Sequence, residues 1–299
     1  MSAIMFSGQG AQKIGMGKEF YDAFAICRAS FDEASEALGF DMPKLCFEEK
    51  ELLSRTEYAQ PALLTVGVAI YRRLSECGFS PDVLMGLSLG EYTAITAADA
   101  FDFADAVRLV HKRGRLMTEL AGDGGMLASI GVNKDVLEDI CKKANEIGFV
   151  ACANYNTYEQ IVLSGEHDAL DACAVEIKNV GGKAMPLKVS GPFHSSLMSD
   201  ASEKFSYEMA GLSVKKPALP IISNVDADFF CIERYADVLT RHMTSPVLWT
   251  KCVEKAISMG VTSFIEIGNG KTLVNFVKKI NGSVNALALE SIKDLEEIL

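Results

Sequence analysis

Apolar residues along this chain alternate between short continuous runs and helical spacing. Ile4-Met5-Phe6 is a short apolar run that enters a glycine-rich turn. Behind it, apolar positions recur three or four residues apart, which predicts one helix with a single buried face. They are Phe20, Phe24, Cys27, Phe31, Ala34 and Leu38. A second apolar helix is predicted from Pro61 to about Leu74, because proline suits the first turn of a helix.

Between about residues 122 and 189 the pattern changes. It predicts strands at 126–132, 149–155, 160–164 and 183–189, and helices at 134–147 and 167–180. The resulting order, βαββαβ, is typical of the ferredoxin-like split unit. We therefore predict an inserted ferredoxin-like subdomain at 122–189, within a discontinuous α/β core formed by residues 1–121 and 190–299.

Further strands are predicted on the C-terminal side of the insertion, at 219–225 and 263–267, and helices alternate with them. Strands that alternate with helices indicate an α/β fold with a mostly parallel sheet covered on both faces. In such sheets the functional site lies at the carboxyl ends of the strands.

Composition narrows the function classes. The chain has 299 residues, which is enough to bury a large core. Its net charge of −11 disfavours nucleic-acid binding. The longest uncharged stretch runs only from Tyr58 to Tyr71 and contains a proline, so no membrane span is expected. The N-terminus lacks the basic flank and long apolar run of a signal peptide.

Cysteine usage points to a reducing compartment. The eight cysteines are scattered and form no C-x-x-C pair. In a chain of this size they are expected to be reduced, small apolar residues of a cytoplasmic protein. Neither a metal site nor a disulfide framework is predicted.

The segment Gly86-Leu87-Ser88-Leu89-Gly90 is a G-x-S-x-G pentapeptide between an apolar strand, 83–85, and a predicted helix, 91–98. This strand–turn–helix setting is that of a nucleophile elbow, where a sharp turn exposes the serine hydroxyl. The flanking glycines suit a turn with little room for side chains. Backbone N–H groups at the start of the helix face the developing negative charge. We therefore expect Ser88 to be an activated nucleophile.

A serine nucleophile needs a base, and the chain has only four histidines. His111 lies on a helix beside a lysine and is expected to be solvated, and His167 begins a helix of the insertion and is expected to be exposed. His194, in the loop 190–196 between an aromatic residue and serines, is better placed for a site. His242 remains open. No acidic residue is obviously placed to orient His194, so a dyad oriented by a backbone carbonyl is favoured over a full triad.

Several motifs in order along the chain closely resemble the malonyl-CoA:acyl-carrier-protein transacylases of bacterial fatty-acid synthesis. They lie at 6–12, 86–92, 113–114, 192–195, 245–249 and 266–271. The resemblance runs from residue 3 to about residue 290. It implies an α/β-hydrolase-like core that carries a ferredoxin-like insertion, in agreement with the pattern described above.

The resemblance also implies catalytic roles. Ser88 would be the nucleophile and His194 its base, while Gln9 and Leu89 would supply the backbone N–H donors of an oxyanion hole. Two positions depart from the family pattern, Leu87 and His242, and the first of them, Leu87, precedes the nucleophile where the family commonly has histidine. That histidine is not the base, so the chemistry is expected to survive.

The same resemblance implies a set of substrate-binding residues, Arg113, Phe193, His242 and Asn156. Arg113 would hold the malonyl carboxylate, to which a planar guanidinium is matched; without the resemblance it reads as a helix-surface charge. Phe193 stands where a bulky residue accompanies malonyl preference, and Asn156 lies near the same pocket. His242 replaces a common glutamine at a position that orients the catalytic imidazole through its main-chain carbonyl, and its imidazole could perturb the pH profile.

The implied reaction is a ping-pong transfer of malonyl from malonyl-CoA to the phosphopantetheine thiol of acyl carrier protein, without a metal or redox cofactor. Carrier proteins are acidic, so a locally basic docking face is expected, from Lys271, Lys278 and Lys279 or from Lys183 and Lys188. Alternatives are an acyltransferase that loads polyketide carrier proteins, a serine thioesterase or esterase, and a non-catalytic carrier-binding subunit. A monomer is the default expectation.

Overall fold

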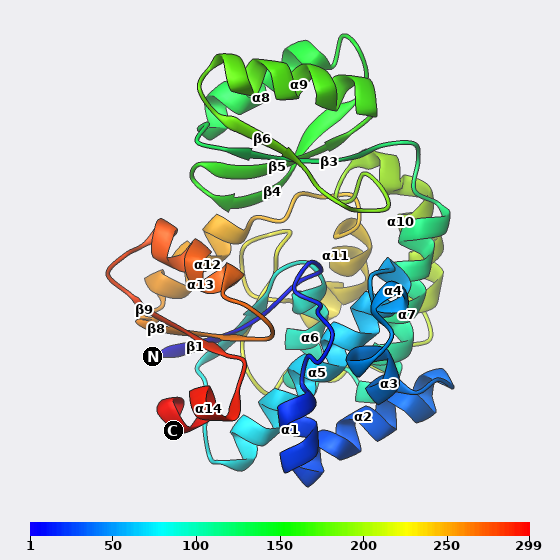
Figure 1. Ribbon diagram of the computed structural model, residues 1–299, viewed down its shortest axis with the longest axis vertical. Coiled ribbons are helices and arrows are strands. Elements are labelled where there is room, and N and C mark those ends of the chain that lie inside the picture. Colours follow the sequence, from blue (N-terminus) through cyan, green and yellow to red (C-terminus); the bar gives the residue numbers. More distant parts are fainter.

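The computed structural model describes residues 1–299 as two sheets enclosed by helices (Figure 1). The larger sheet has five strands in the order β7-β2-β1-β8-β9, and every neighbouring pair is parallel. Its strands are β1 (Ser2–Phe6), β2 (Val83–Gly86), β7 (Ile221–Ile222), β8 (Ser263–Ile267) and β9 (Asn285–Leu289). A parallel sheet within a mixed α/β fold was predicted from the sequence and is confirmed.

Both faces of this sheet are buried, as the continuous apolar strands require. Ile4 and Phe6 of β1 point to one face and join the core formed with three helices, whereas Ala3 and Met5 point to the other. The first face is covered by α5 (Thr56–Glu76), α6 (Leu89–Ala97) and α7 (Phe103–Glu119), and the second by α12 (Trp249–Ser258) and α13 (Thr272–Ile280). The finer likeness of this core to α/β-hydrolases stays a prediction.

The second sheet is antiparallel and has the strand order β4-β5-β3-β6. It comprises β3 (Gly125–Ile130), β4 (Val150–Thr157), β5 (Gln160–Gly165) and β6 (Lys183–Pro186), with α8 (Lys134–Ala144) and α9 (His167–Asn179) packed on its outer face. These elements follow the expected order βαββαβ. A short parallel bridge joins Asn154 of β4 to Val247 of the core. The division of the chain at residues 122 and 189 stays a prediction.

The remaining helices surround the part of the molecule that contains the parallel sheet (Figure 1). They are α1 (Lys18–Ala23), α2 (Ala25–Leu38), α3 (Met42–Phe47), α4 (Lys50–Leu53), α10 (Ser199–Met209), α11 (Tyr235–Arg241) and α14 (Ile292–Ile298). None of the helices combines the length and the apolar character that crossing a bilayer requires.

The structure corrects two predicted helices. The single helix predicted through Phe20 and Leu38 is broken at Phe24, whose backbone is extended, and Arg28 caps the end of α1 by donating to two of its carbonyl oxygens. The helix predicted from Pro61 begins at Thr56, so this proline lies in the second turn. The added turn buries polar side chains, which is why the apolar pattern did not include it.

Strand and helix ends also differ from prediction. The strand expected at 219–225 is only Ile221–Ile222, because Pro220 has no N–H to donate and the chain turns after Ile222, where the N–H of Ser223 donates to the Asp228 carbonyl. The strand expected at 183–189 ends at Pro186, and the helix expected at 134–147 ends at Ala144. None of these changes moves the carboxyl end of β2, where the elbow lies.

Candidate active site

The turn between β2 and α6 has the geometry of a nucleophile elbow. Ser88 has φ 53° and ψ −106°, a backbone conformation that non-glycine residues rarely adopt. The glycines around it are needed for close contact: a Cβ on Gly86 would lie 2.1 Å from the carbonyl carbon of Gly90, and one on Gly90 would lie 2.1 Å from the carbonyl oxygen of Phe6. The turn is therefore as tight as the G-x-S-x-G pattern indicated.

His194 faces this serine from the loop between β6 and α10. Its Nε2 lies 2.8 Å from Ser88 Oγ, and its Nδ1 lies 2.8 Å from the main-chain oxygen of His242. The structure therefore brings Ser88 and His194 together as the sequence predicted. No carboxylate bonds to His194, and its second nitrogen bonds to a backbone carbonyl.

The surroundings of His194 favour its neutral form. Burial lowers the pKa of its imidazole to about 4, and the nearby Arg113 guanidinium acts in the same direction. The main-chain oxygen of His242, which accepts from the ring, opposes this, and the backbone of Ser245 raises the pKa in the same way. A neutral imidazole is the form that can accept the proton of a serine hydroxyl.

Two backbone N–H groups border the elbow and have no acceptor in the protein. That of Leu89 is the first of α6, where no intrahelical acceptor exists. That of Gln9 lies in the loop after β1, and the Gln9 side chain is anchored by donating to Thr56 Oγ1 at 3.0 Å. Both residues line the same cavity as Ser88. The arrangement suits stabilisation of an oxyanion.

The serine and histidine open into a cavity of about 410 Å³ between the two sheets. Its walls come from the elbow, the loop after β1, α7, α13 and the inner face of the antiparallel sheet. Among the predicted residues, the cavity is lined by Gln9, Ser88, Leu89, Arg113, Asn156, Phe193 and His194, and also by Leu87 and Lys188. Asn156 is buried, and its side-chain oxygen has no hydrogen-bond partner.

Arg113 is a buried cation without a counter-ion. Its side chain is 1% exposed, Nη1 donates to Gln60 Oε1 at 2.9 Å, and Nε and Nη2 have no partner. Its guanidinium also stacks 5.0 Å from the centre of the Tyr92 ring. A buried, unpaired guanidinium is energetically unfavourable until an anion binds to it. The cavity therefore presents two free donor atoms suited to a carboxylate.

The structure corrects the prediction that His242 binds substrate. Its side chain is 0% exposed and does not line the cavity. The ring packs behind His194, with ring centres 5.3 Å apart, because the chain after α11 turns this side chain into the core. Its main-chain oxygen, and not its ring, is the hydrogen-bond partner of the His194 imidazole.

Sequence analysis missed three residues of the site, Gln60, Glu91 and Asn224. Gln60 is the only hydrogen-bond partner of the Arg113 guanidinium. Asn224 Oδ1 accepts the backbone N–H of Ser88 at 2.7 Å, and the backbone N–H of Asn224 donates to Glu91 at 2.8 Å. Polarity inside predicted apolar segments was the available signal: Gln60 borders an apolar helix, and Asn224 lies in a predicted strand.

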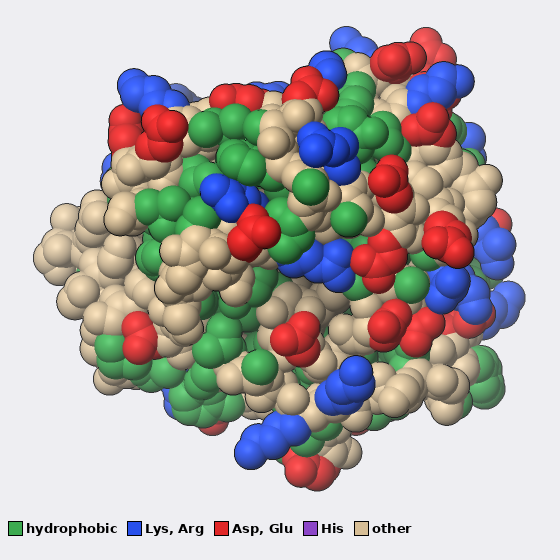
Figure 2. Space-filling model, turned by 90° about the horizontal axis from the view of Figure 1, so that it is seen from below, with side chains coloured by type: hydrophobic (Ala, Val, Ile, Leu, Met, Phe, Trp, Pro, Cys, Tyr) green, Lys and Arg blue, Asp and Glu red, His purple; other side chains and the backbone are tan.

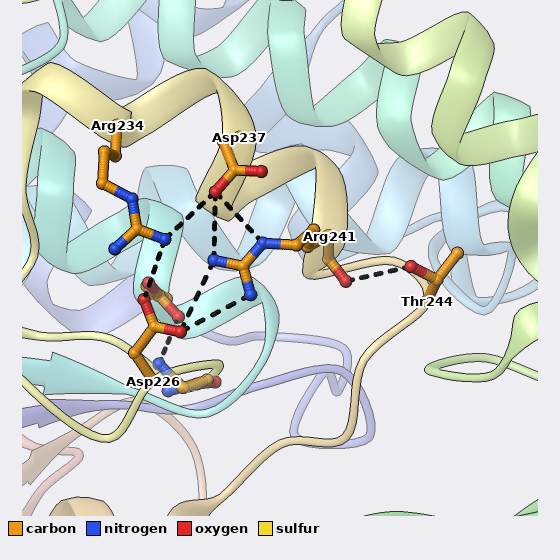
Figure 3. Close-up of polar contacts among 7 residues, drawn as sticks. Asp226, Arg234, Asp237, Arg241 and Thr244 are labelled. Atoms are coloured by element: carbon orange, nitrogen blue, oxygen red, sulfur yellow. Dashed lines mark hydrogen bonds and ion pairs between the residues drawn. The ribbon is translucent and has the colours of Figure 1, made fainter.

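An ion-pair cluster ties together the two segments that hold the elbow and the base. Figure 3 shows Arg241, at the end of α11, between Asp237 of the same helix and Asp226 of the loop after β7. Arg234 pairs with the same two carboxylates, and Thr244 bonds to the Arg241 carbonyl. Asn224 lies two residues before Asp226, and His242 directly follows Arg241. The cluster is partly exposed, so its contribution to stability is modest.

The other two histidines lie outside the cavity. His111 is half-buried, with its ring 5.8 Å from that of Phe40 and 5.7 Å from that of Tyr58, so the expectation of a solvated residue was wrong. Burial lowers its pKa. His167 is exposed, as expected.

Comparisons with known proteins agree with this geometry. A family model described as "Acyl transferase domain" matches residues 4–294. The malonyl CoA-acyl carrier protein transacylase of Bacillus subtilis (strain 168) is 42% identical, and the alignment covers 98% of this chain and 95% of that protein. The protein of the same name from Escherichia coli (strain K12) is 39% identical over 96% of this chain and 95% of its own length.

Solved structures give the same picture. The malonyl CoA-acyl carrier protein transacylase of Clostridium perfringens Atcc 13124 matches with a TM-score of 0.96 and 43% identity, covering 99% of this chain and 95% of that one. A second structure, PlMCAT:AntF (holo), is described as a type II PKS acyl-carrier protein in complex with its malonyl-transacylase. It matches with a TM-score of 0.97 and 35% identity, covering 100% of this chain and 98% of that one.

Proposed function

The chain belongs to the acyl transferase family that includes the malonyl CoA-acyl carrier protein transacylases, and on that basis we propose that it transfers malonyl from malonyl-CoA to acyl carrier protein through a malonyl-serine at Ser88. One observation carries the proposal: the Ser88–His194 pair opens into the same cavity as the buried, unpaired Arg113. A nucleophile, a neutral base and an unpaired cation are the parts that malonyl transfer needs.

In the first half-reaction Ser88 Oγ attacks the thioester carbonyl while His194 Nε2 takes the hydroxyl proton. The N–H groups of Gln9 and Leu89 hold the oxyanion of the tetrahedral intermediate. The carbon–sulfur bond then breaks, and the proton on His194 goes to the departing CoA thiolate. The products are free CoA and an ester between malonyl and Ser88.

In the second half-reaction the phosphopantetheine thiol of the carrier protein occupies the place of CoA. His194 takes the thiol proton, sulfur attacks the ester carbonyl, and the bond to Ser88 Oγ breaks. The proton returns to the serine, and malonyl-carrier protein leaves. The proposed steps need no metal or redox cofactor.

Selection of malonyl rests on the two free donors of Arg113. A malonyl carboxylate pairs with the guanidinium, whereas a neutral acyl group leaves the cation buried and unpaired. Phe193, which is 5% exposed and lines the cavity, limits the space beside the base. Asn156 adds an unpartnered acceptor on the insertion side of the cavity.

Docking of an acidic carrier protein is proposed at the cavity mouth. The face seen from below, on the side away from the antiparallel sheet, carries acidic and basic side chains interspersed (Figure 2), so it offers no extended basic surface. Lys188 instead lines the cavity itself. Lys278 and Lys279 lie in the last turn of α13, whose Thr272 and Phe276 line the cavity as well.

The test is intact-mass analysis of the protein after mixing with malonyl-CoA or, separately, acetyl-CoA. We expect a malonyl adduct with malonyl-CoA, little adduct with acetyl-CoA, and loss of the malonyl adduct when holo-acyl carrier protein is added, with a matching gain on the carrier. Peptide mapping should place the adduct on Ser88.

Two variants make the test specific. Ser88→Ala should form no adduct, whereas Ser213→Ala, a matched change at an exposed loop serine, should react like the parent. Release of free malonate at the same rate with and without carrier would mean a thioesterase and would overturn the proposal. So would the absence of any adduct with malonyl-CoA.

A further inference from the structure

A buried carboxyl group and a buried imidazole lie directly behind the elbow, and the proposed reaction uses neither side chain. Glu91, in the first turn of α6, and His242, directly after α11, are both 0% exposed. Glu91 Oε2 lies 3.6 Å from His242 Nε2. Burying two ionisable groups is unfavourable unless they have well-placed partners, so their position here calls for a reason.

Asn224 connects this pair to the nucleophile. Its backbone N–H donates to Glu91 Oε2 at 2.8 Å, and its side-chain amide donates to the Gly86 carbonyl at 2.8 Å. Its Oδ1 accepts the backbone N–H of Ser88 at 2.7 Å, and His242 Nε2 lies 3.4 Å from the same oxygen. The side chain of Asn224 therefore bridges the elbow, while Glu91 and His242 hold it from behind.

The surroundings of His242 decide which ring nitrogen carries the proton. Nε2 faces two oxygens, Asn224 Oδ1 and Glu91 Oε2, whereas Nδ1 has no partner. A neutral imidazole has one donor and one acceptor nitrogen, so the proton belongs on Nε2 while Glu91 is ionised. Protonation of Glu91 removes the negative charge that faces the ring and adds a donor beside it.

We propose that the imidazole of His242 is a positioning group for the nucleophile: together with Glu91 it orients the Asn224 side chain, which holds the backbone N–H of Ser88. The inference rests on the proposed role of Ser88. The strained backbone of this serine persists only where its surroundings hold it, and Asn224 supplies the hydrogen bond to its amide. Displacing a reacting group by roughly 1 Å lowers the rate by about 100-fold.

Other ionisable groups face the pair from each packed element. They are Arg113 of α7, His194 of the loop before α10, Asp226 of the loop after β7, Cys252 of α12 and Tyr92 of α6. Burial raises the pKa of Glu91 to about 7, and the N–H of Asn224 partly opposes this. Burial, with His194 and Arg113 nearby, holds the pKa of His242 well below its usual range. Glu91 is therefore the member of the pair that titrates near neutral pH.

Two substitutions at His242 separate its side chain from its main chain. His242→Gln keeps a side-chain N–H donor, and His242→Leu keeps apolar bulk without a donor. Both keep the main-chain oxygen that accepts from His194. We expect His242→Leu to lower kcat by about tenfold or more with little change in KM for malonyl-CoA, and His242→Gln to restore most of kcat.

The dependence of kcat on pH distinguishes a positioning role of His242 from a purely structural one, because a structural role would not change it. We expect kcat of the parent protein to rise with the ionisation of Glu91, near pH 7, and this step to disappear in Glu91→Gln and His242→Leu. Cys252→Ala is the matched control, because this buried thiol also faces Glu91 but donates to the Ser223 carbonyl and forms no hydrogen bond with Asn224. The Cys252→Ala variant should therefore keep the rise of kcat near pH 7.

Each possible result of these experiments supports or overturns the proposed role of His242. A His242→Leu variant with parental kcat and an unchanged pH step overturns the inference, as does an equal loss in the Gln and Leu variants that follows their melting temperatures. If His242→Leu does not fold, the pH profile of Glu91→Gln decides alone, and a retained step overturns the inference. Absence of any malonyl adduct on Ser88 in the parent protein would instead mean that the proposed function fails.

Discussion

The Nδ1 atom of His194 lies 2.8 Å from the main-chain oxygen of His242. Because a carbonyl oxygen can only accept, the ring proton belongs on Nδ1, and Nε2 is left as the acceptor that faces Ser88. A carbonyl also carries no net charge, so it orients the ring without raising the imidazole pKa as strongly as a carboxylate would. The arrangement favours a base that is neutral well below pH 7.

The first prediction concerns this base. The Glu91→Gln background removes the buried carboxyl group whose pKa is about 7. In this background, kcat/KM for malonyl-CoA should stay near its maximum down to about pH 5. It should then fall with an apparent pKa near 4, because protonated His194 cannot accept the serine proton. A steady-state pH–rate profile measures this, and an apparent pKa near the ordinary histidine value of about 6.5 would contradict it.

The same shift predicts how stability depends on pH. The pKa of His194 is about 4 in the folded chain, against an ordinary value of 6.5 when the chain is unfolded. Between these values the unfolded chain binds more protons, so the free energy of unfolding should decrease as pH falls from about 6.5 towards 4. Comparing denaturant unfolding of the parent and His194→Gln at pH 7 and pH 5 isolates the contribution. Equal losses in both proteins would contradict it.

The second prediction concerns substrate choice. Arg113→Ala removes the buried cation, so transfer of malonyl should fall while transfer of acetyl is spared, and the malonyl-to-acetyl ratio of kcat/KM should drop by about 100-fold or more. Arg113→Lys should recover only part of the ratio, because an ammonium cannot reproduce the planar fork. Arg108→Ala, an exposed arginine on the same helix, is the control. An unchanged ratio in Arg113→Ala would exclude the proposed pairing.

The reactive groups could be predicted from the sequence because tight local geometry selects particular residues. Only glycine fits at the two ends of the elbow, so the G-x-S-x-G pattern marks Ser88 directly. His194 could be chosen because a histidine in a loop rarely serves a core. The supporting groups could not be assigned this way: the polarity of Asn224 inside a predicted strand marks it as unusual but does not show what it contacts, and nothing local distinguishes Glu91. Their roles depend on contacts between segments more than 130 residues apart.

The fold, like the site, was predicted correctly where local pattern decides and missed where contacts between distant segments decide. Apolar runs identified β1, β2 and β8, because strands buried on both faces are mostly apolar. The start of α5 escaped prediction, since Thr56 and Gln60 are polar residues that the fold buries as partners of Gln9 and Arg113. Polar residues are buried where they have a functional role or a tertiary hydrogen-bond partner. The spacing of apolar residues along the chain cannot predict such partners.

The third prediction concerns the ion-pair cluster of Figure 3. Arg241→Ala should lower the free energy of unfolding by about 1 kcal/mol or less, because the cluster is partly exposed. It should lower kcat by only a few-fold, since it loosens the segment that carries His242 without removing its carbonyl. A double-mutant cycle with Asp226→Asn, repeated at low and high salt, measures the coupling between the two residues. A coupling that does not weaken with salt would contradict the assignment.

The last prediction concerns the carrier protein. Lys279 follows the cavity-lining Phe276 by three residues on α13, so the two side chains occupy neighbouring positions on the helix surface. Alanine at Lys278 and Lys279 together should raise KM for holo-acyl carrier protein several-fold and leave kcat/KM for malonyl-CoA unchanged, because only the acidic protein needs the basic surface. Lys188→Ala should raise KM for the carrier and KM for malonyl-CoA, since this lysine lines the cavity that both substrates use. Lys293→Ala, on the exposed side of α14, is the control. An unchanged KM for the carrier in the double variant would move the docking site away from α13.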